Sequence, residues 1–309
     1  MIRFQSVSKH YRQVAALSGV SFDICEGDIF GYIGPNGAGK TTTIKILTGL
    51  IRDFEGKVTV YGSNVQTRDG SHKRLIGYLP QDAGFQEWRT VNHVLYTFAR
   101  LSGLGKSECD RKILQVLKKV GILEHRDRKV VHLSGGTVQK LRFAQAILHD
   151  PKILVLDEPL SGLDPSSRYH MKELIREFAE GNRMVFLSSH ILNDVEDVAN
   201  RIGILHAGRM RKIGTPNELR TEFDLGNILE IELSEQTDLP KEISTLEYIQ
   251  AVSSIGTKTH RLEIDRGTDL DRAVHGILEQ LLSSRIHIRG FQCVRPSLED
   301  AYLSYTEEH

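Results

Sequence analysis

The sequence lacks any hydrophobic run long enough to cross a membrane. No apolar stretch approaches the roughly 20 residues that a membrane-spanning helix needs. The first residues, MIRFQSVSKHYRQ, also lack the apolar centre of a secretory signal peptide. We therefore expect a cytoplasmic protein that would depend on a separate membrane protein for any work at a membrane.

The chain also lacks an excess of charge of either sign, and it has little cysteine. Its 309 residues include 40 Lys plus Arg and 40 Asp plus Glu, so the formal net charge is zero. A protein built mainly to hold nucleic acid usually carries a net basic charge, and we expect no nucleic-acid partner here. The three cysteines, Cys25, Cys109 and Cys293, lie far apart in the sequence. That spacing predicts no metal site and is typical of reduced cytosolic thiols.

The hydrophobic pattern predicts an α/β domain followed by a small α+β domain. Short apolar runs such as ILVLDEP and MVFLSSH are typical of buried strands, whereas residues from about 82 to 135 have helical spacing and predict a helical insert. In that insert, Ser107 and Asp110 have the spacing of a capping box at a helix start. Past residue 220, NILEIEL, THRLEID and IHIRGFQCV predict strands. We expect domains at residues 1–220 and 221–309.

The segment GPNGAGKT fits the phosphate-loop pattern G-x-x-x-x-G-K-[ST] and lies between a buried-strand pattern and a helical one. Its glycines let backbone N–H groups point at phosphate oxygens, and the helix N-terminus adds a positive dipole. Lys40 can neutralise the β- and γ-phosphates of a nucleotide, and Thr41 can ligate Mg²⁺. The expected nucleotide-binding residues are Gly34, Pro35, Asn36, Gly37, Ala38, Gly39, Lys40, Thr41 and Thr42.

Two carboxylates, Asp157 and Glu158, follow the apolar run at residues 153–156. Ligands of open α/β sheets bind at the carboxyl ends of the strands. Asp157 can hold Mg²⁺ through water, and Glu158 can act as the general base that accepts a proton from an attacking water. Paired acids at a strand end are also common in solvated turns, so this assignment depends on the phosphate loop upstream.

A second paired-glycine turn stands in HLSGGTVQK, although one nucleotide needs only one glycine-rich cradle. Leu133-Ser-Gly-Gly resembles the signature motif of ATP-binding cassette (ABC) ATPases, and that family's other motifs are present in order. The resemblance implies that Tyr11 stacks on adenine and that His190 in LSSH is the catalytic switch histidine. It also implies that Gln81 in GYLPQ is the catalytic-site glutamine near the metal, and that Asp164 in SGLD contacts nucleotide. The sequence departs from the family pattern at Thr137, Lys140, Gln145 and Leu160.

In this family the signature serves the nucleotide held by a second subunit. The resemblance therefore implies that the signature closes over the ATP held by Lys40 of a partner chain. Its contacting residues are Ser134, Gly135 and Gly136, which stand just before a helix expected from about Val138. Because the chain has one phosphate loop and one signature, we expect a homodimer that holds ATP and Mg²⁺ between its subunits.

The resemblance covers residues 1 to about 220 and implies a P-loop ABC ATPase fold, with a RecA-like core, an N-terminal antiparallel β subdomain and the helical insert. It implies the ATP-hydrolysing subunit of a transporter, held at the inner face of the cell membrane by a separate permease. The tail, from GTPNEL to RPSLEDAYLSYTEE, resembles those of drug, antibiotic and lipid-related exporters and favours export; a regulatory or dimer-stabilising domain, which importers also carry, is the alternative. Phe85 and Trp88 stand in a polar segment, and we expect them to anchor the permease; packing within the insert is the alternative.

Two other functions compete with transport. Soluble ABC ATPases act in translation or DNA repair, but the former carry two cassettes and the latter a long coiled coil, and neither feature occurs here. A P-loop kinase or GTPase would not require the glutamine, signature and histidine motifs together. The guanine-binding pattern N-K-x-D is also missing from the sequence.

Overall fold

The computed structural model describes residues 1–67, 70–82, 84–222, 227–237, 239–265, 267–294 and Tyr302. Contacts divide the chain into two compact units, Met1–Pro216 and Asn217–Glu308. The boundary expected at residue 220 falls inside helix α7 (Pro216–Glu222), so the domain limits stay a prediction. Apart from Tyr302, the tail RPSLEDAYLSYTEE lies outside the described residues. Within the described ranges, no helix is both long and apolar enough to span a bilayer.

An antiparallel sheet forms the N-terminal part of the first unit, with strand order β2-β1-β4-β5. Its strands are β1 (Ile2–Tyr11), β2 (Val14–Ile24), β4 (Glu55–Val60) and β5 (Ser63–Asn64). Ile2 and Phe4 point into the core, as alternation requires. A register shift and a φ of 48° at Ser6 then turn Val7 inward in place of Ser6.

The second sheet of this unit is mostly parallel, in the order β10-β9-β3-β8-β7-β6. Only β10 (Arg209–Gly214) is antiparallel, to β9 (Arg201–His206). The inner strands β3 (Ile29–Ile33), β7 (Ile153–Asp157) and β8 (Met184–Ser189) are buried throughout, and β6 (Ile76–Leu79) pairs with β7. Such continuous burial is typical of a parallel sheet covered on both faces.

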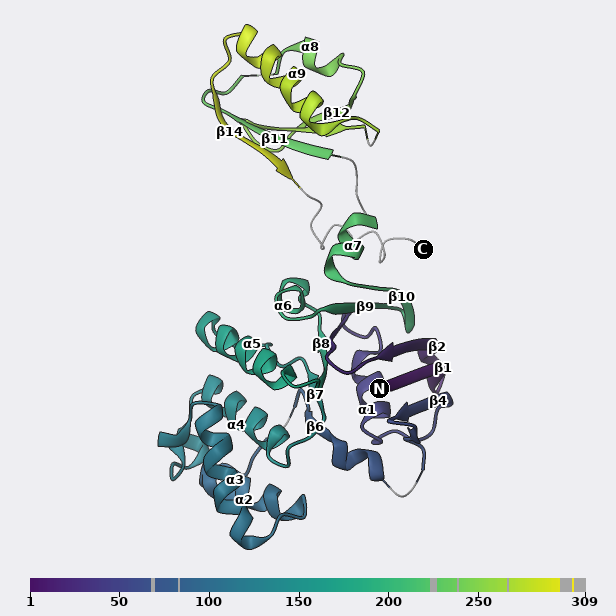
Figure 1. Cartoon of the computed structure of the whole chain (residues 1–309), viewed down its shortest axis with the longest axis vertical. Coiled ribbons are helices and arrows are strands. Elements are labelled where there is room, and N and C mark those ends of the chain that lie inside the picture. Colours follow the sequence, from purple (N-terminus) through teal and green to yellow (C-terminus); the bar gives the residue numbers. More distant parts are fainter. Residues whose placement is uncertain are drawn as a thin grey trace. The chain divides into compact units, whose positions relative to one another are not determined.

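Helices cover this central sheet. Helix α1 (Lys40–Leu47) contributes Ile44 and Leu47 to one core shared with both sheets, where the rings of Phe22, Phe30 and Phe186 stack. Figure 1 shows α2, α3 and α4 grouped on the other side of the central sheet from β1, β2 and β4. The remaining bounds are α2 (Val91–Leu101), α3 (Lys106–Lys119), α4 (Gly135–Ile147), α5 (Pro165–Ala179), α6 (Leu192–Glu196) and the short 3₁₀ turns Ser71–Leu75, Leu123–His125 and Val130–His132.

Two expected helix starts are wrong. Helix α3 begins at Lys106, because Gly105 is extended and its carbonyl accepts hydrogen bonds from the N–H groups of Glu108 and Cys109, so Ser107 is not a cap. Helix α4 begins at Gly135 rather than near Val138. The Ser134 hydroxyl accepts a hydrogen bond from the Thr137 N–H, which makes Ser134 the N-cap and the paired glycines part of the first turn.

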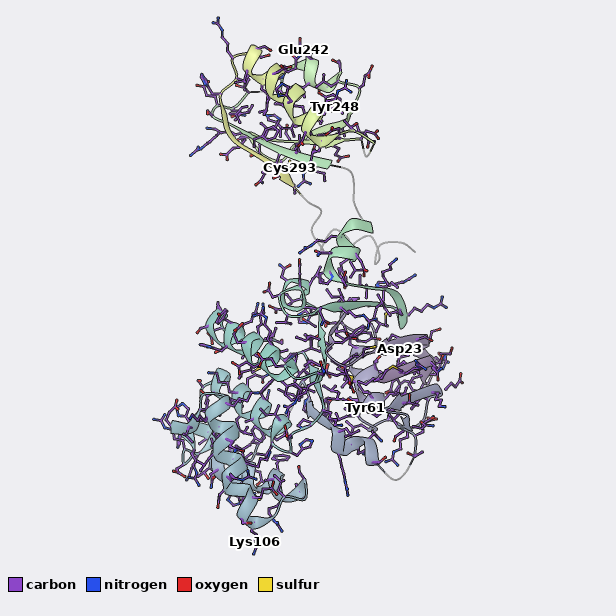
Figure 2. The ribbon with its side chains drawn as sticks, in the orientation of Figure 1. Asp23, Tyr61, Lys106, Glu242, Tyr248 and Cys293 are labelled. Carbon is purple, nitrogen blue, oxygen red and sulfur yellow. The ribbon has the colours of Figure 1, made fainter. Side chains whose placement is uncertain are left out.

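The second unit is a four-stranded antiparallel sheet in the order β12-β13-β11-β14, with a helical layer. Helix α9 (Leu270–Ser283) packs Ile277 and Leu281 on it, and a Cβ on Gly276 would lie 2.3 Å from the Tyr248 hydroxyl. Figure 2 labels Tyr248 in this unit. The other bounds are β11 (Asn227–Leu233), α8 (Lys241–Ser244), β12 (Ile249–Ser254), β13 (Thr259–Ile264) and β14 (Ile288–Val294). The predicted combination of an α/β unit and a small α+β unit is confirmed.

Candidate functional site

The glycine-rich loop joins the buried strand β3 to α1, as its motif requires. Close approach of neighbouring backbone fixes two glycines: a Cβ on Gly34 would lie 2.3 Å from the Leu205 carbonyl oxygen, and one on Gly39 would lie 2.4 Å from that of Ala16. Gly39 also has a φ of 111°, which side chains other than glycine's rarely allow. The loop is therefore held open at the N-terminus of α1, where its backbone can surround an anion.

A cavity of about 380 Å³ opens beside this loop. It brings together Tyr11 from the end of β1, Gln81 from the segment after β6, and Glu158 from the end of β7. Gly34, Pro35 and Ala38 do not line it, and Ala38 packs in the core. The other lining residues are Ala16, Asn36, Gly37, Gly39, Lys40, Thr41 and Thr42.

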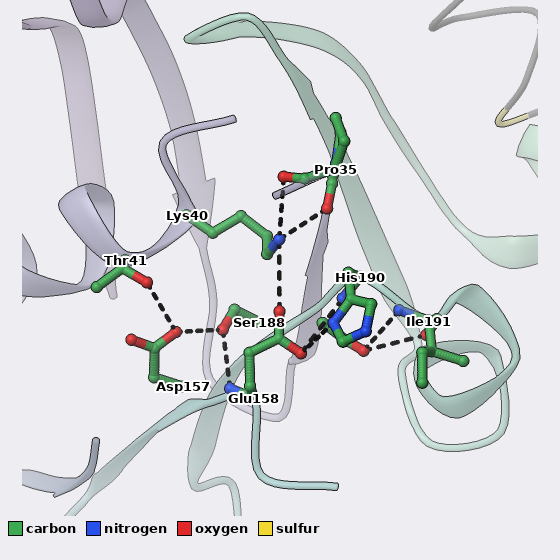
Figure 3. A network of polar contacts seen from close by, with 10 residues as sticks. Pro35, Lys40, Thr41, Asp157, Glu158, Ser188, His190 and Ile191 are labelled. Atoms are coloured by element: carbon green, nitrogen blue, oxygen red, sulfur yellow. Dashed lines mark hydrogen bonds and ion pairs between the residues drawn. The ribbon is translucent and has the colours of Figure 1, made fainter. Parts of the chain in front are cut away.

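The Lys40 side chain is buried and folds over the loop (Figure 3). Its ammonium donates hydrogen bonds to the carbonyl oxygens of Gly34 at 2.7 Å and Pro35 at 3.3 Å. The same Nζ lies 3.4 Å from Oε1 of Glu158, whose side chain is also buried. The positive charge of Lys40 and the negative charge of Glu158, both buried, thus compensate each other where these residues line the cavity.

Asp157 lies beside the first turn of α1. Its Oδ1 accepts hydrogen bonds from Ser188 Oγ at 2.7 Å and from Thr41 Oγ1 at 3.4 Å. Burial raises the pKa of this carboxyl above its ordinary value, and the two hydroxyls oppose that rise. No cluster of three or more His, Cys, Asp or Glu side chains suited to a metal occurs in the part of the chain that the structure describes. One hydroxyl and one carboxylate beside a phosphate loop fit Mg²⁺, which takes few protein ligands and completes its shell with phosphate and water.

Glu158 has a strained backbone and a fixed side chain. Its φ is 51°, a left-handed conformation that costs about 1–3 kcal/mol in a residue other than glycine and often marks a functional site. The Glu158 N–H donates to Ser188 Oγ at 3.1 Å, and its Oε2 lies 2.8 Å from Nδ1 of His190 (Figure 3). The carboxylate therefore stands between Lys40 and His190, where it faces the phosphate loop.

Tyr11 and Gln81 stand at the open edge of the cavity. The Tyr11 side chain is 46% exposed, so its ring is accessible to a planar ligand, and the ammonium of Lys9 lies 5.3 Å from the ring centroid. Gln81 is exposed just past β6. The structure therefore groups both residues with the phosphate loop, although 70 positions separate them in the sequence.

The signature turn does not line this cavity. It packs instead on the first turn of α5, since a Cβ on Gly136 would lie 2.3 Å from Ser167 Oγ. Asp164 caps that helix by accepting hydrogen bonds from the N–H and the hydroxyl of Ser167, which hold the pKa of Asp164 below its ordinary value. A Cβ on Gly135 would meet no atom within 4 Å. The predicted nucleotide-binding residues thus form two groups within one chain, and in the signature group Ser134 and Gly135 are exposed while Gly136 packs on α5.

Two residues at the site were missed by sequence reasoning. Ser188 contacts both carboxylate residues, and its place in LSSH two positions before His190 was an available signal. Ala16 lines the cavity from β2 and carries no sequence signal, because a small residue in a strand is common.

The two aromatic residues expected at the permease contact differ in their surroundings. The Phe85 ring packs edge-on against Phe98 of α2, with 6.2 Å between ring centroids, whereas Trp88 is 68% exposed. A groove of about 250 Å³ lies beside Phe85 and is also lined by Gly84, Gln86, Arg89, Val94, Thr97 and Phe98. Packing within the insert therefore buries part of the Phe85 side chain, whereas it buries little of the Trp88 side chain.

Comparison with known proteins gives the family. Residues 17–161 match the ABC transporter family, and residues 214–306 match the C-terminal domain of DrrA1-3-like ATP-binding proteins. The chain is 35% identical to the ABC transporter ATP-binding protein YxlF of Bacillus subtilis, covering 98% of each chain. It is 29% identical to the linearmycin resistance ATP-binding protein LnrL of the same organism, covering 99% of this chain and 98% of that one.

A solved structure of the ATP-binding subunit of an ABC transporter has a TM-score of 0.66 and 29% identity, covering 73% of this chain and 94% of that chain. The resemblance drawn from the signature and phosphate-loop motifs is therefore confirmed, and so is the expected P-loop cassette fold. The chain belongs to the family of ABC transporter ATP-binding subunits.

Proposed function

We propose that this subunit hydrolyses ATP between two copies of itself and thereby drives export through a separate membrane permease. The observation that carries the proposal is the division of the site within one chain. Lys40 and Glu158 line the cavity and His190 contacts Glu158, whereas the signature at Ser134 to Gly136 does not line the cavity, and its Ser134 and Gly135 are exposed.

The residues of the cavity divide the chemistry among them. ATP phosphates entering the loop compete with Glu158 and the loop carbonyls for the Lys40 ammonium, so Lys40 turns toward phosphate. Glu158 then accepts the proton of the attacking water, while Nδ1 of His190 keeps its carboxylate oriented. Thr41, Asp157 and Gln81 would hold Mg²⁺, which supplies positive charge to the phosphate oxygens.

The second copy completes the site with its signature. The N-terminus of α4 presents backbone N–H groups and the Ser134 hydroxyl, and the lack of neighbours around Gly135 leaves room for a phosphate. Each charge-assisted hydrogen bond to that phosphate contributes about 1.5–3 kcal/mol. A few such bonds are enough for ATP to hold a dimer together and for hydrolysis to release it.

The proposed direction of transport, export, is inferred from similar proteins and not from the geometry of the ATP site. The relative LnrL is named for resistance to linearmycin, and the C-terminal match is to DrrA1-3-like ATP-binding proteins. The permease would hold the subunit at the inner face of the membrane, with the groove beside Phe85 and the exposed Trp88 as its contact.

The test uses Glu158→Gln, which keeps the shape of the side chain but cannot take a proton. We expect ATP binding to persist and steady-state turnover to fall by about 10²–10⁴-fold, the usual scale for loss of a general base. The variant should also form a stable dimer with ATP, seen by analytical ultracentrifugation. Turnover close to that of the wild type would remove Glu158 from this role, and a variant that stays monomeric with saturating ATP would contradict the shared site.

A further inference from the structure

A buried polar side chain joins the signature helix to the residue that follows Glu158. Gln139, in α4, is 7% exposed. Its Nε2 donates a hydrogen bond to the Pro159 carbonyl oxygen at 2.8 Å, and its Oε1 accepts one from Arg142 at 3.2 Å. Both ends of the buried amide are therefore paired, and its orientation is fixed.

The hydrogen bond falls at the point where the backbone is strained. Glu158 has a φ of 51°, and its N–H is already held by Ser188 Oγ. Pro159 has no N–H to donate, so Gln139 holds this residue through its carbonyl, while the Glu158 carbonyl accepts a hydrogen bond from the Ser161 N–H at 3.3 Å. Ser188 thus contacts the backbone at the N–H of Glu158, and Gln139 contacts it one residue later, at the Pro159 carbonyl. The two contacts together fix the direction in which the Glu158 carboxylate leaves the chain.

The same side chain lies close to the signature. Gln139 follows Ser134 by five positions, within the first turns of α4, and the helix transmits any displacement of its N-terminus as a rigid rod. On the proposed function, that N-terminus serves the partner's ATP, whereas Glu158 serves the ATP bound by its own chain. Gln139 thus stands between the two ATP sites of a dimer.

We propose that Gln139 is a positioning residue that couples the two ATP sites, since it ties the turn bearing the catalytic carboxylate to the helix bearing the signature. When the signature closes on the partner's ATP, the position of α4 becomes fixed. The hydrogen bond from Gln139 then fixes the position of the Pro159 carbonyl and, through the backbone, the orientation of the Glu158 carboxylate. The proposal rests on the proposed roles of Glu158 and the signature. It assigns Gln139 no contact with ATP.

The test compares three variants of the full-length protein. Gln139→Met removes the amide, and Gln139→Glu keeps the shape and the acceptor for Arg142 but places a carboxylate against the Pro159 carbonyl. Gln66→Met is the matched control, because the Gln66 amide donates a similar hydrogen bond to the Phe54 carbonyl, at 3.2 Å, away from the cavity. Nucleotide affinity is measured with a fluorescent ATP analogue, and turnover is measured as a function of ATP concentration.

We expect both Gln139 variants to lower kcat by roughly 2- to 13-fold, the equivalent of one neutral hydrogen bond, with little change in affinity for the analogue. Their Hill coefficients should fall toward 1, and the control should match the wild type. In a Glu158→Gln background, Gln139→Met should cause no further loss, because a residue that acts through Glu158 has nothing left to position.

An additive loss in that background would overturn the proposal, and so would a wild-type kcat in the Gln139 variants. An unchanged Hill coefficient would equally reject coupling between the sites. Gln139→Glu keeps the test decisive if Gln139→Met does not fold, which the melting temperature reports. Failure of the proposed function is a separate result, because it appears as normal turnover in Glu158→Gln alone.

Discussion

Replacing Gly135 by alanine separates the signature's role in a dimer from its role in the fold of one chain. A Cβ at this position meets no atom within 4 Å, and the residue is the first of α4 with no positive φ to lose. Alanine there also restricts the unfolded chain, which raises the free energy of unfolding by about 0.4–1 kcal/mol. We therefore expect a melting temperature equal to or slightly above that of the wild type.

The same methyl group should damage the ATP site of a dimer. It would occupy the open space in front of the α4 N-terminus, where the partner's γ-phosphate is expected. Loss of one charge-assisted hydrogen bond, at about 1.5–3 kcal/mol, weakens ATP-driven dimerisation and turnover by roughly 13- to 160-fold. Binding of ATP to the chain's own phosphate loop should not change.

Gly136→Ala serves as the contrasting control. Its Cβ would lie 2.3 Å from Ser167 Oγ and 3.1 Å from Ser167 Cβ, so the first turn of α5 must shift and the melting temperature should fall. Calorimetry gives the stabilities, and ultracentrifugation with ATP gives the dimerisation. A Gly135→Ala protein that dimerises and hydrolyses ATP like the wild type would refute the reasoning, because the signature would then face no phosphate.

Three further predictions concern the metal, the permease and the second unit. Burial raises the pKa of Asp157, and only the ionised carboxylate ligates Mg²⁺. As the pH falls, Mg²⁺-dependent ATP binding, measured by titration at several pH values, should therefore weaken at a higher pH than an aspartate of ordinary pKa would give. Weakening only in the usual aspartate range would contradict this. Trp88→Ala should keep the wild-type melting temperature and basal turnover but lose most of the permease in co-purification, and full recovery of the permease would exclude Trp88 as an anchor. A chain ending after Glu222 should still bind ATP with Mg²⁺, because every residue that lines the cavity precedes it; a folded truncation that binds none would place part of the site in the second unit.

Local motifs made the phosphate loop and its flanking elements predictable. GPNGAGKT carries its own conformational requirements, and the strand and helix on either side follow from hydrophobic spacing, as β3 and α1 confirm. The convergence of Tyr11, Gln81 and Glu158 on one cavity depends on the pairing of strands far apart in the sequence. Only the likeness to a known family supplied that grouping in advance.

Helix starts and side-chain contacts were harder to predict. The Ser134 cap begins α4 at Gly135, ahead of the expected start near Val138, although glycine has a low helix propensity. The strained φ of Glu158 and its contact with Ser188 leave no trace in hydrophobic spacing, because both depend on how β7 and β8 lie side by side. Gln139 carries no sequence signal of its own, because its burial depends on how α4 packs against the segment that follows β7.

The most direct test of the shared ATP site mixes two defective chains. Ser134→Arg fills the signature's anion site, and Lys40→Ala removes the cation that holds a chain's own γ-phosphate. Each homodimer carries two damaged sites, whereas the mixed dimer places both lesions in one site and leaves the other intact. We predict that ATPase activity returns on mixing, and that each mutant mixed with wild-type chains is also active. If those single-lesion mixtures hydrolyse ATP while the double-lesion mixture stays inactive, the phosphate loop and the signature do not meet across the dimer.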